Sequence, residues 1–92
     1  MRLCEVIEAL ARFDCGDTIY ARKPWTAQSE AVVAREPDAG GLPAKAEQTG
    51  MAYFLEVAIA QEVIENLVAL RPHPQTLSMI CHRLIDYAGN DA

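Results

Sequence analysis

Segment 51–70 constrains the fold most, because its apolar residues fit two kinds of secondary structure. Its first part has apolar side chains at every second position, as in a strand with one buried face: Met51, Tyr53, Leu55 and Val57. Its second part repeats them every three or four positions, as in an amphipathic helix: Leu55, Ile59, Val63, Leu67 and Leu70. We predict a strand near 51–57 and a helix near 59–70. One continuous helix stays open as the alternative, because no Ser, Thr, Asp or Asn stands at 57–59 to cap a second helix.

Both ends of the chain are predicted to be helical. Residues 2–14 place one apolar face on a helix that Gly16 is suited to end: Leu3, Val6, Ile7, Leu10 and Phe13. Residues 75–88 follow a proline-rich break at 71–74 and repeat the pattern: Leu77, Ile80, Cys81, Leu84, Ile85 and Ala88. Gly89 is suited to end this last helix.

Two short strands are predicted between these helices. Residues 17–22 contain Thr, Ile and Tyr, which suit a pleated sheet, and residues 29–35 centre on two valines. Pro24 lies between them and lacks the N–H that a sheet ladder needs. The pattern predicts a hairpin with a long loop.

Residues 36–50 form the clearest loop of the sequence, since turn-forming residues are concentrated there: Pro37, Asp38, Gly40, Gly41, Pro43 and Gly50. Connections of this length are uncommon in a small domain and often carry function. The loop is therefore our first candidate for a contact surface, and a simple connector is the alternative.

These elements predict an α+β fold with the order α-β-β-β-α-α. Its sheet has three strands, is mostly antiparallel and carries the helices on one face. The 92 residues lie within the size range of one domain, so we treat residues 1–92 as a single domain.

The charge balance restricts the class of partner. The chain has 13 Asp and Glu against 8 Lys and Arg, a net charge of −5. Nucleic-acid binding needs clustered basic residues, and Arg22-Lys23 is the only adjacent basic pair. We therefore expect no nucleic-acid or membrane partner and favour a basic protein. Solubility alone is the simpler explanation of this charge.

Cysteine usage indicates the compartment. An odd number of cysteines without a visible secretory signal is typical of free thiols in a reducing cytosol, so we expect a cytoplasmic protein. No apolar run approaches the ~20 residues of a membrane helix. Cys4 and Cys81 lie on predicted apolar faces and are expected to be buried, whereas Cys15 is expected to be more exposed.

No motif for catalysis, metal binding or cofactor binding is recognisable. Cys81 and His82 are adjacent, so their side chains diverge on a helix by about 100°. Glu62 and Glu65 share a predicted helical face and can serve acid–base chemistry in a cleft, although such a pair is usually a solvated surface. We predict no catalytic residue, metal or cofactor; an enzyme that uses Glu62 and Glu65 or a Cys–His pair is the third hypothesis.

Acidic residues recur around the second strand and the long loop, and we predict that they form a negative patch for a basic partner: Glu30, Glu36, Asp38 and Glu47. Trp25 and Tyr20 are candidate aromatic anchors of the same surface, since Trp and Tyr are frequent at interaction hot spots. The alternative places Trp25 as a lid on the fold. A rival acidic patch comprises Glu62, Glu65 and Asp86.

The order of these features resembles the immunity proteins of contact-dependent-inhibition and related polymorphic toxin systems in bacteria. The resemblance covers most of the chain and rests on a Tyr-x-x-x-Pro-Trp turn, a Val-Val strand, the acidic loop and a Tyr-Ala-x-Asn-Asp end: Tyr20, Pro24, Trp25, Tyr87, Ala88, Asn90 and Asp91. It implies no catalytic residue. It implies a protein that binds one cognate toxin domain and blocks its active site, with nucleases, whose clefts are basic, among such toxins.

Two function classes therefore compete. The leading hypothesis is a non-enzymatic cytosolic immunity protein that acts as a monomer or small homo-oligomer. The alternative is a small adaptor or subunit that works through constitutive homo- or hetero-oligomerisation, and it predicts an exposed apolar face on segment 51–70.

Overall fold

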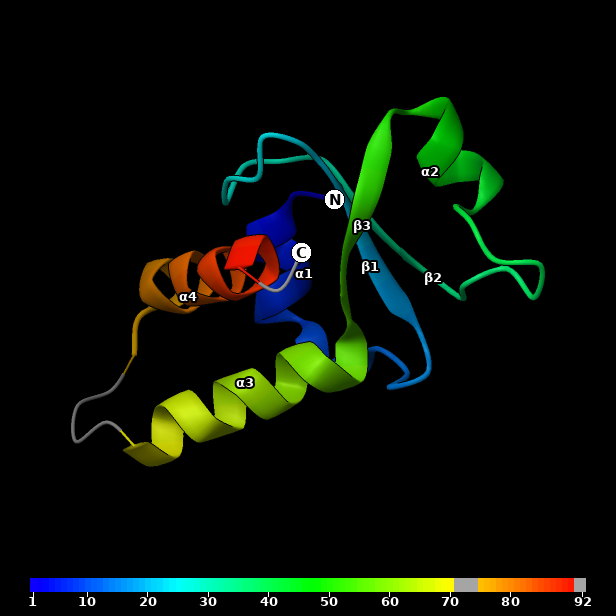
Figure 1. Cartoon of the computed structure of the whole chain (residues 1–92). Helices are drawn as coiled ribbons and strands as arrows, with labels where there is room; N and C mark the ends of the chain where they lie inside the picture. Colours follow the sequence, from blue (N-terminus) through cyan, green and yellow to red (C-terminus); the bar gives the residue numbers. More distant parts are fainter. Residues whose placement is uncertain (71–74, 91–92) are drawn as a thin grey trace.

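A three-stranded sheet organises the molecule, with its strands in the order β2-β1-β3 and both pairings antiparallel (Figure 1). The computed structural model describes residues 1–70 and 75–90. Its elements are α1 (Leu3–Glu8), the 3₁₀ helix η1 (Leu10–Arg12), β1 (Thr18–Arg22), β2 (Ala31–Ala34), α2 (Ala44–Gln48), β3 (Met51–Glu56), α3 (Val57–Leu70) and α4 (Leu77–Asn90). The predicted α+β class with a three-stranded antiparallel sheet is confirmed, and the predicted order lacked only η1 and α2.

The N-terminal helix is shorter than predicted, because α1 ends at Glu8 and the chain continues as η1. Leu10 and Phe13 are three residues apart, a spacing that one 3₁₀ turn places on one side. Leu10 is buried and Phe13 half-buried in the same core. The predicted helix end at Gly16 is wrong, since Gly16 lies in a turn where its N–H donates to Asp14 Oδ1 at 2.9 Å.

The predicted hairpin is confirmed: β1 pairs with β2 in a register that sets Tyr20 opposite Val32. Its long loop is tied to the start of α1, where the first N–H groups of a helix lack partners within the helix. The Leu3 N–H donates to the Ser29 carbonyl at 2.8 Å, and the Cys4 N–H donates to the Ala27 carbonyl at 2.9 Å. The loop therefore caps α1.

The prediction that residues 36–50 form only a loop is wrong, because they contain α2. Its residues Ala, Lys, Glu and Gln are strong helix formers. Ala46 is fully buried against Tyr20 and Met51 of the sheet, which gives this short helix its tertiary support. Gly50 follows with a φ of +71°, a conformation that glycine adopts without strain, and the chain then enters β3.

The split of segment 51–70 into strand and helix is confirmed, and the continuous-helix alternative is wrong. β3 carries a bulge that the alternation did not predict. Tyr53 pairs with Tyr20 and Leu55 with Ile19, so Phe54 is an extra residue in the ladder. A bulge lets consecutive side chains reach one core, and Phe54 and Leu55 are both buried there.

The last helix matches its predicted apolar face. Cys81, Leu84 and Ala88 are buried, whereas Leu77, Ile80 and Ile85 pack half-buried against them. The helix continues through Gly89 to Asn90 instead of ending before it. The predicted break at 71–74 lies outside the described residues.

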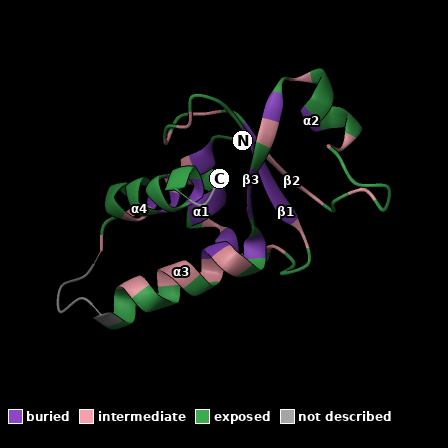
Figure 2. Cartoon of the chain, viewed as in Figure 1, coloured by how far each residue is buried: buried purple, intermediate pink, exposed green. Residues whose placement is uncertain are grey.

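The two faces of the sheet are covered unequally. One face packs against α1, α3 and α4 in the main core, which includes Leu3, Val6, Ile19, Leu55 and Leu84. The opposite face carries the small core, which consists of Tyr20, Ala46 and Met51 with Val32, Ala34 and Leu42 at its edge. Figure 2 shows buried residues concentrated in α1, β1 and β3, whereas α2 and the far part of α3 are mostly exposed or half-buried.

Candidate functional site

The predicted binding residues lie at both ends of β2 and do not form one continuous patch. Glu30 precedes the strand, whereas Glu36 and Asp38 follow it. The four strand residues alone separate the two groups by roughly 13 Å. Glu47 lies exposed on α2, beside the small core.

Trp25 is half-buried and packs against the main core. Its ring makes an edge contact with Phe54, with ring centroids 5.0 Å apart. Its indole N–H donates to the Ala21 carbonyl at 3.2 Å, and the Lys23 ammonium lies 4.9 Å from the ring centroid. Trp25 therefore covers part of the main core, as the lid alternative predicts.

Glu30 forms an ion pair with the N-terminus of the chain. Its carboxylate lies 3.9 Å from the N-terminal ammonium of Met1, and the Arg2 and Glu30 backbones form a β-bridge. Both charged groups of this ion pair are exposed to solvent, so the pair contributes little to stability.

Tyr20 lies beneath the surface of the small-core face, with only 1% of its area exposed. Burial raises the pKa of its phenol, and the Glu36 carboxylate raises this pKa further, while the Thr18 hydroxyl lowers it by partial hydrogen bonding. No contact of the phenol oxygen within residues 1–70 and 75–90 has the geometry of a full hydrogen bond. A buried polar group without a partner costs about 1–3 kcal/mol of stability. The exposed aromatic residue of this face is Tyr53, whose ring makes an edge contact with Tyr20.

A hollow of about 380 Å³ opens at the end of the sheet where β1 begins and β2 and β3 end. We call it the sheet-end hollow and define it by its lining residues: Cys15, Gly16, Thr18, Arg35, Glu36, Asp38 and Glu56. Three carboxylates and one guanidinium belong to its lining. Within the described parts of the chain no ion pair engages any of these four charged groups. The carboxylates outnumber the guanidinium, so the hollow carries a net negative charge.

Sequence reasoning found Glu36 and Asp38 of this hollow but did not connect them with Glu56. The hollow requires β3 to lie beside β1, so that Glu56 stands opposite Thr18. That pairing is a long-range contact, and no local pattern in the sequence indicates it.

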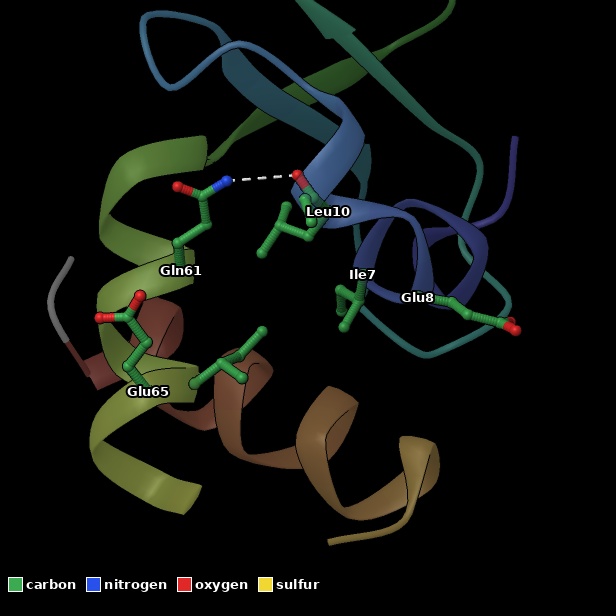
Figure 3. Close-up of a pocket in the computed structure, with 7 residues that line it drawn as sticks. Ile7, Glu8, Leu10, Gln61 and Glu65 are labelled. Atoms are coloured by element: carbon green, nitrogen blue, oxygen red, sulfur yellow. Dashed lines mark hydrogen bonds between the residues drawn. The ribbon is translucent and has the colours of Figure 1, made fainter. Parts of the chain in front are cut away.

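A second hollow, of about 450 Å³, lies between α3 and the N-terminal helices α1 and η1. We call it the helix groove; its lining residues are Ile7, Glu8, Leu10, Ala11, Gln61, Ile64 and Glu65. Figure 3 shows Ile7 and Leu10 on one side and Gln61 and Glu65 of α3 on the other. The Gln61 amide donates to the Leu10 carbonyl at 3.3 Å and joins the two walls. The groove thus has an apolar floor and a polar, acidic margin.

The rival acidic patch is distributed over two helices. Glu65 borders the helix groove, and Glu62 lies exposed on the same helix α3. Asp86 lies exposed on α4. Glu62 and Glu65 are both exposed, so the pair matches the solvated surface that such spacing usually gives.

The candidate nucleophiles and ligands are scattered. Cys81 is buried, and burial raises the pKa of its thiol, with a further contribution from Cys4, which keeps it in the unreactive protonated form. Cys15 is exposed, as predicted, and His82 is exposed as well, whereas Cys4 is half-buried instead of buried. Residues 1–70 and 75–90 contain no group of three or more His, Cys, Asp or Glu side chains placed to hold a metal ion.

In the described portion of the chain, no helix combines the length and the apolar character that crossing a bilayer requires.

Comparison with known proteins gives one result. The chain matches, over residues 1–92, a family described as a domain of unknown function, DUF7716. The chain belongs to the DUF7716 family. No curated protein and no solved structure matches it. The DUF7716 match spans every element of the fold, from α1 to α4.

Proposed function

We propose that this DUF7716 chain is a non-enzymatic binding protein for a basic protein partner. In its most concrete form it is a cytosolic immunity protein that occludes the active site of a cognate bacterial toxin. The sequence resemblance suggests the role, and the electrostatics of the folded chain support it.

One observation carries the proposal: most acidic side chains of the described residues are exposed and outside ion pairs. Among residues 1–70 and 75–90, the only ion pair joins the N-terminal ammonium to Glu30. With a net charge of −5, the molecule therefore has a negative field at its surface. Such a field accelerates association with a basic surface and selects against acidic partners.

Two faces of the molecule are available for the contact. The sheet-end hollow offers three carboxylates beside Arg35, and the helix groove offers an apolar floor beside Glu65. Hot spots combine a desolvated anchor with a polar margin. Since Tyr20 and Trp25 are packed into the fold, we assign the apolar part of the contact to the floor of the helix groove.

A neutralisation assay tests the proposal. The product of the neighbouring gene is expressed in a sensitive bacterium with this chain, and survival is compared with that of cells lacking the chain. We expect the chain to restore growth. A matched pair of variants then locates the contact: Glu36→Lys with Asp38→Lys alters the sheet-end hollow, and Glu62→Lys with Glu65→Lys alters the helix face. Unchanged protection by both variants, or a toxic product that the wild-type chain does not bind, contradicts the proposal.

A second candidate function rests on a separate observation. In α3, Val63, Ile64 and Leu67 are half-buried, and Val68 is 56% exposed. The adaptor hypothesis predicts an exposed apolar face on segment 51–70, so the exposure of Val68 supports it. Sedimentation of the purified chain separates the two functions, because a monomer supports the immunity protein and an obligate oligomer supports the adaptor.

A further inference from the structure

The helix groove joins an apolar floor to an acidic margin, and the two together select one kind of partner segment. We propose that the groove binds an amphipathic α-helix of the partner, which presents two apolar side chains one turn apart and carries Lys or Arg beside them. The identity of the partner rests on the proposed function, whereas the binding chemistry of the groove is testable without that partner.

The apolar floor of the groove continues along α3. Ile7 and Leu10 form one wall and are almost fully buried, and Ile64 is half-buried on the other. Val68 lies one turn beyond Ile64 on the same side of α3, where 56% of its area is exposed. Residues four apart on a helix are separated by about 6 Å along its axis. The floor therefore offers two apolar positions at the spacing of residues i and i+4 on an incoming helix.

The walls of the groove favour a helical segment over an extended one. They are built from α1, η1 and α3, whose backbone groups are largely hydrogen-bonded within the helices themselves. The Leu10 carbonyl at the wall already accepts from the Gln61 amide at 3.3 Å (Figure 3). An extended segment in the groove would find no ladder of N–H and C=O groups, whereas a helix satisfies its own backbone.

The margin of the groove determines the charge of the segment. Glu65 stands on the α3 wall, and Glu62 lies exposed one turn before it. Glu8 borders the groove from α1 and extends outward, away from α3 (Figure 3). Within residues 1–70 and 75–90 none of these carboxylates forms an ion pair, and the lining contains no Lys or Arg, since Arg12 lines a neighbouring hollow. Basic side chains beside the apolar ones would therefore meet carboxylates without a competing cation.

The same margin disfavours a second copy of the chain as the occupant. A symmetric dimer uses the same surface patch on both subunits. The Glu65 margin of one copy would then face the Glu65 margin of the other, and like charges across an interface oppose association. Charge complementarity thus favours a basic partner at this groove over the self-association that the exposed Val68 alone would suggest.

The test titrates the full chain with a designed, blocked peptide of about 14 residues, a length at which an Ala-rich segment begins to form a helix in water. The peptide consists of Ala and Lys with two Leu residues four positions apart on one helical face. The backbone amides of Ala11 and Ile64, which lie on opposite walls of the groove, serve as the NMR reporters. We expect saturable shifts at both amides.

Two further peptides separate pattern from charge. One has the same composition but places the two Leu residues on opposite helical faces, and its affinity should be about fivefold weaker or more, because only one of them reaches the floor. The other keeps the Leu pattern and replaces every Lys by Glu, and it should give no saturable shifts at the two amides.

Two exposed positions of α3 test the floor and the margin without disturbing the core. Val68→Ser is expected to weaken binding of the first peptide about threefold, and Glu65→Gln about twofold. Met79→Ser is the matched apolar control, since it removes an exposed apolar side chain of α4. Glu36→Gln is the matched charge control, because it removes a carboxylate of the sheet-end hollow. Both controls should leave the peptide affinity unchanged.

Three results would overturn the inference. The first is the absence of saturable shifts at Ala11 and Ile64. The second is equal affinity for the two arrangements of Leu, which would indicate attraction by charge alone. The third is a shift of these amides that grows with the concentration of the chain alone, which would assign the groove to a second copy.

The neutralisation assay distinguishes failure of this inference from failure of the proposed function. A chain that protects cells but does not bind the first peptide keeps its function and loses this account of the bound segment. A chain that binds the peptide at the groove but protects no cells keeps the site and loses the immunity role.

Discussion

The two faces of the sheet differ in how completely they are packed. The main-core face holds side chains from α1, β1, β2, β3, α3 and α4 in one cluster. The small core buries three apolar residues, Tyr20, Ala46 and Met51, next to a helix of five residues. Most of the buried apolar residues therefore lie on the main-core face, whereas the small-core face holds the buried Tyr20 phenol.

A cavity in the main core should give the largest loss of stability. Leu84 is 1% exposed on α4, and Leu84→Ala removes three buried carbons from the cluster that joins α4 to α1 and the sheet. We expect the free energy of unfolding to fall by about 3 kcal/mol, measured by urea unfolding. A loss below about 1 kcal/mol would mean that α4 contributes little to the main core.

The same truncation in the small core should be milder. Met51→Ala removes a buried side chain beneath α2, where few neighbours surround it and α2 is free to settle. We expect a loss of about 1–2 kcal/mol in the same urea experiment. The exposed Met79 provides the matched control, and Met79→Ala should change stability by less than about 0.5 kcal/mol. A loss for Met51→Ala equal to that for Leu84→Ala would remove the distinction between the two faces.

The unpartnered phenol predicts a pH-dependent difference between wild type and Tyr20→Phe. At neutral pH the variant should match or exceed the wild type in stability, by up to about 1 kcal/mol, because it removes a buried hydroxyl without a partner. The pKa of Tyr20 is raised in the folded chain from its ordinary value of 10.0. The unfolded chain therefore loses this proton first, and wild-type stability should decline relative to the variant as the pH rises above about 10.

Urea midpoints of both proteins at pH 8 and pH 11 measure this difference. A constant difference between the two proteins across that range would show that the phenol titrates alike in the folded and unfolded chain.

Charge reversal at the hollow should have the smallest effect on the fold. Glu36 and Asp38 are exposed and form no ion pair within residues 1–70 and 75–90. Replacing both by Lys should change the free energy of unfolding by less than about 0.5 kcal/mol, as thermal unfolding can measure. A larger loss would assign these carboxylates to the fold instead of to binding.

The sequence predicted the elements whose apolar period is long and regular. The faces of α1 and α4, the hairpin and the change from strand to helix near Val57 follow from local pattern. The helix α2 was not predicted, because its five residues are too few to show a helical repeat of apolar side chains. Its support comes from the packing of Ala46 against the sheet. The bulge at Phe54 was also missed, because only the pairing with β1 defines it.

The candidate site was predictable only in part, for the same reason. Glu36 and Asp38 were identified from the composition of the loop, but their neighbour Glu56 enters through strand pairing. Trp25 and Tyr20 were predicted from residue type as anchors, and residue type does not report burial. Trp25 packs against Phe54, and Tyr20 is buried in the small core.

The ionic-strength dependence of the association rate is the sharpest test of the proposed binding to a basic partner. The claim is that an uncompensated negative surface receives a basic partner, and the measurement follows binding of this chain to the purified product of the neighbouring gene by stopped flow. We predict that the rate constant falls about tenfold or more between 10 mM and 500 mM salt, and that Glu36→Lys with Asp38→Lys lowers the low-salt rate toward the high-salt value. A rate constant independent of salt, and equal for the two proteins, would contradict the account.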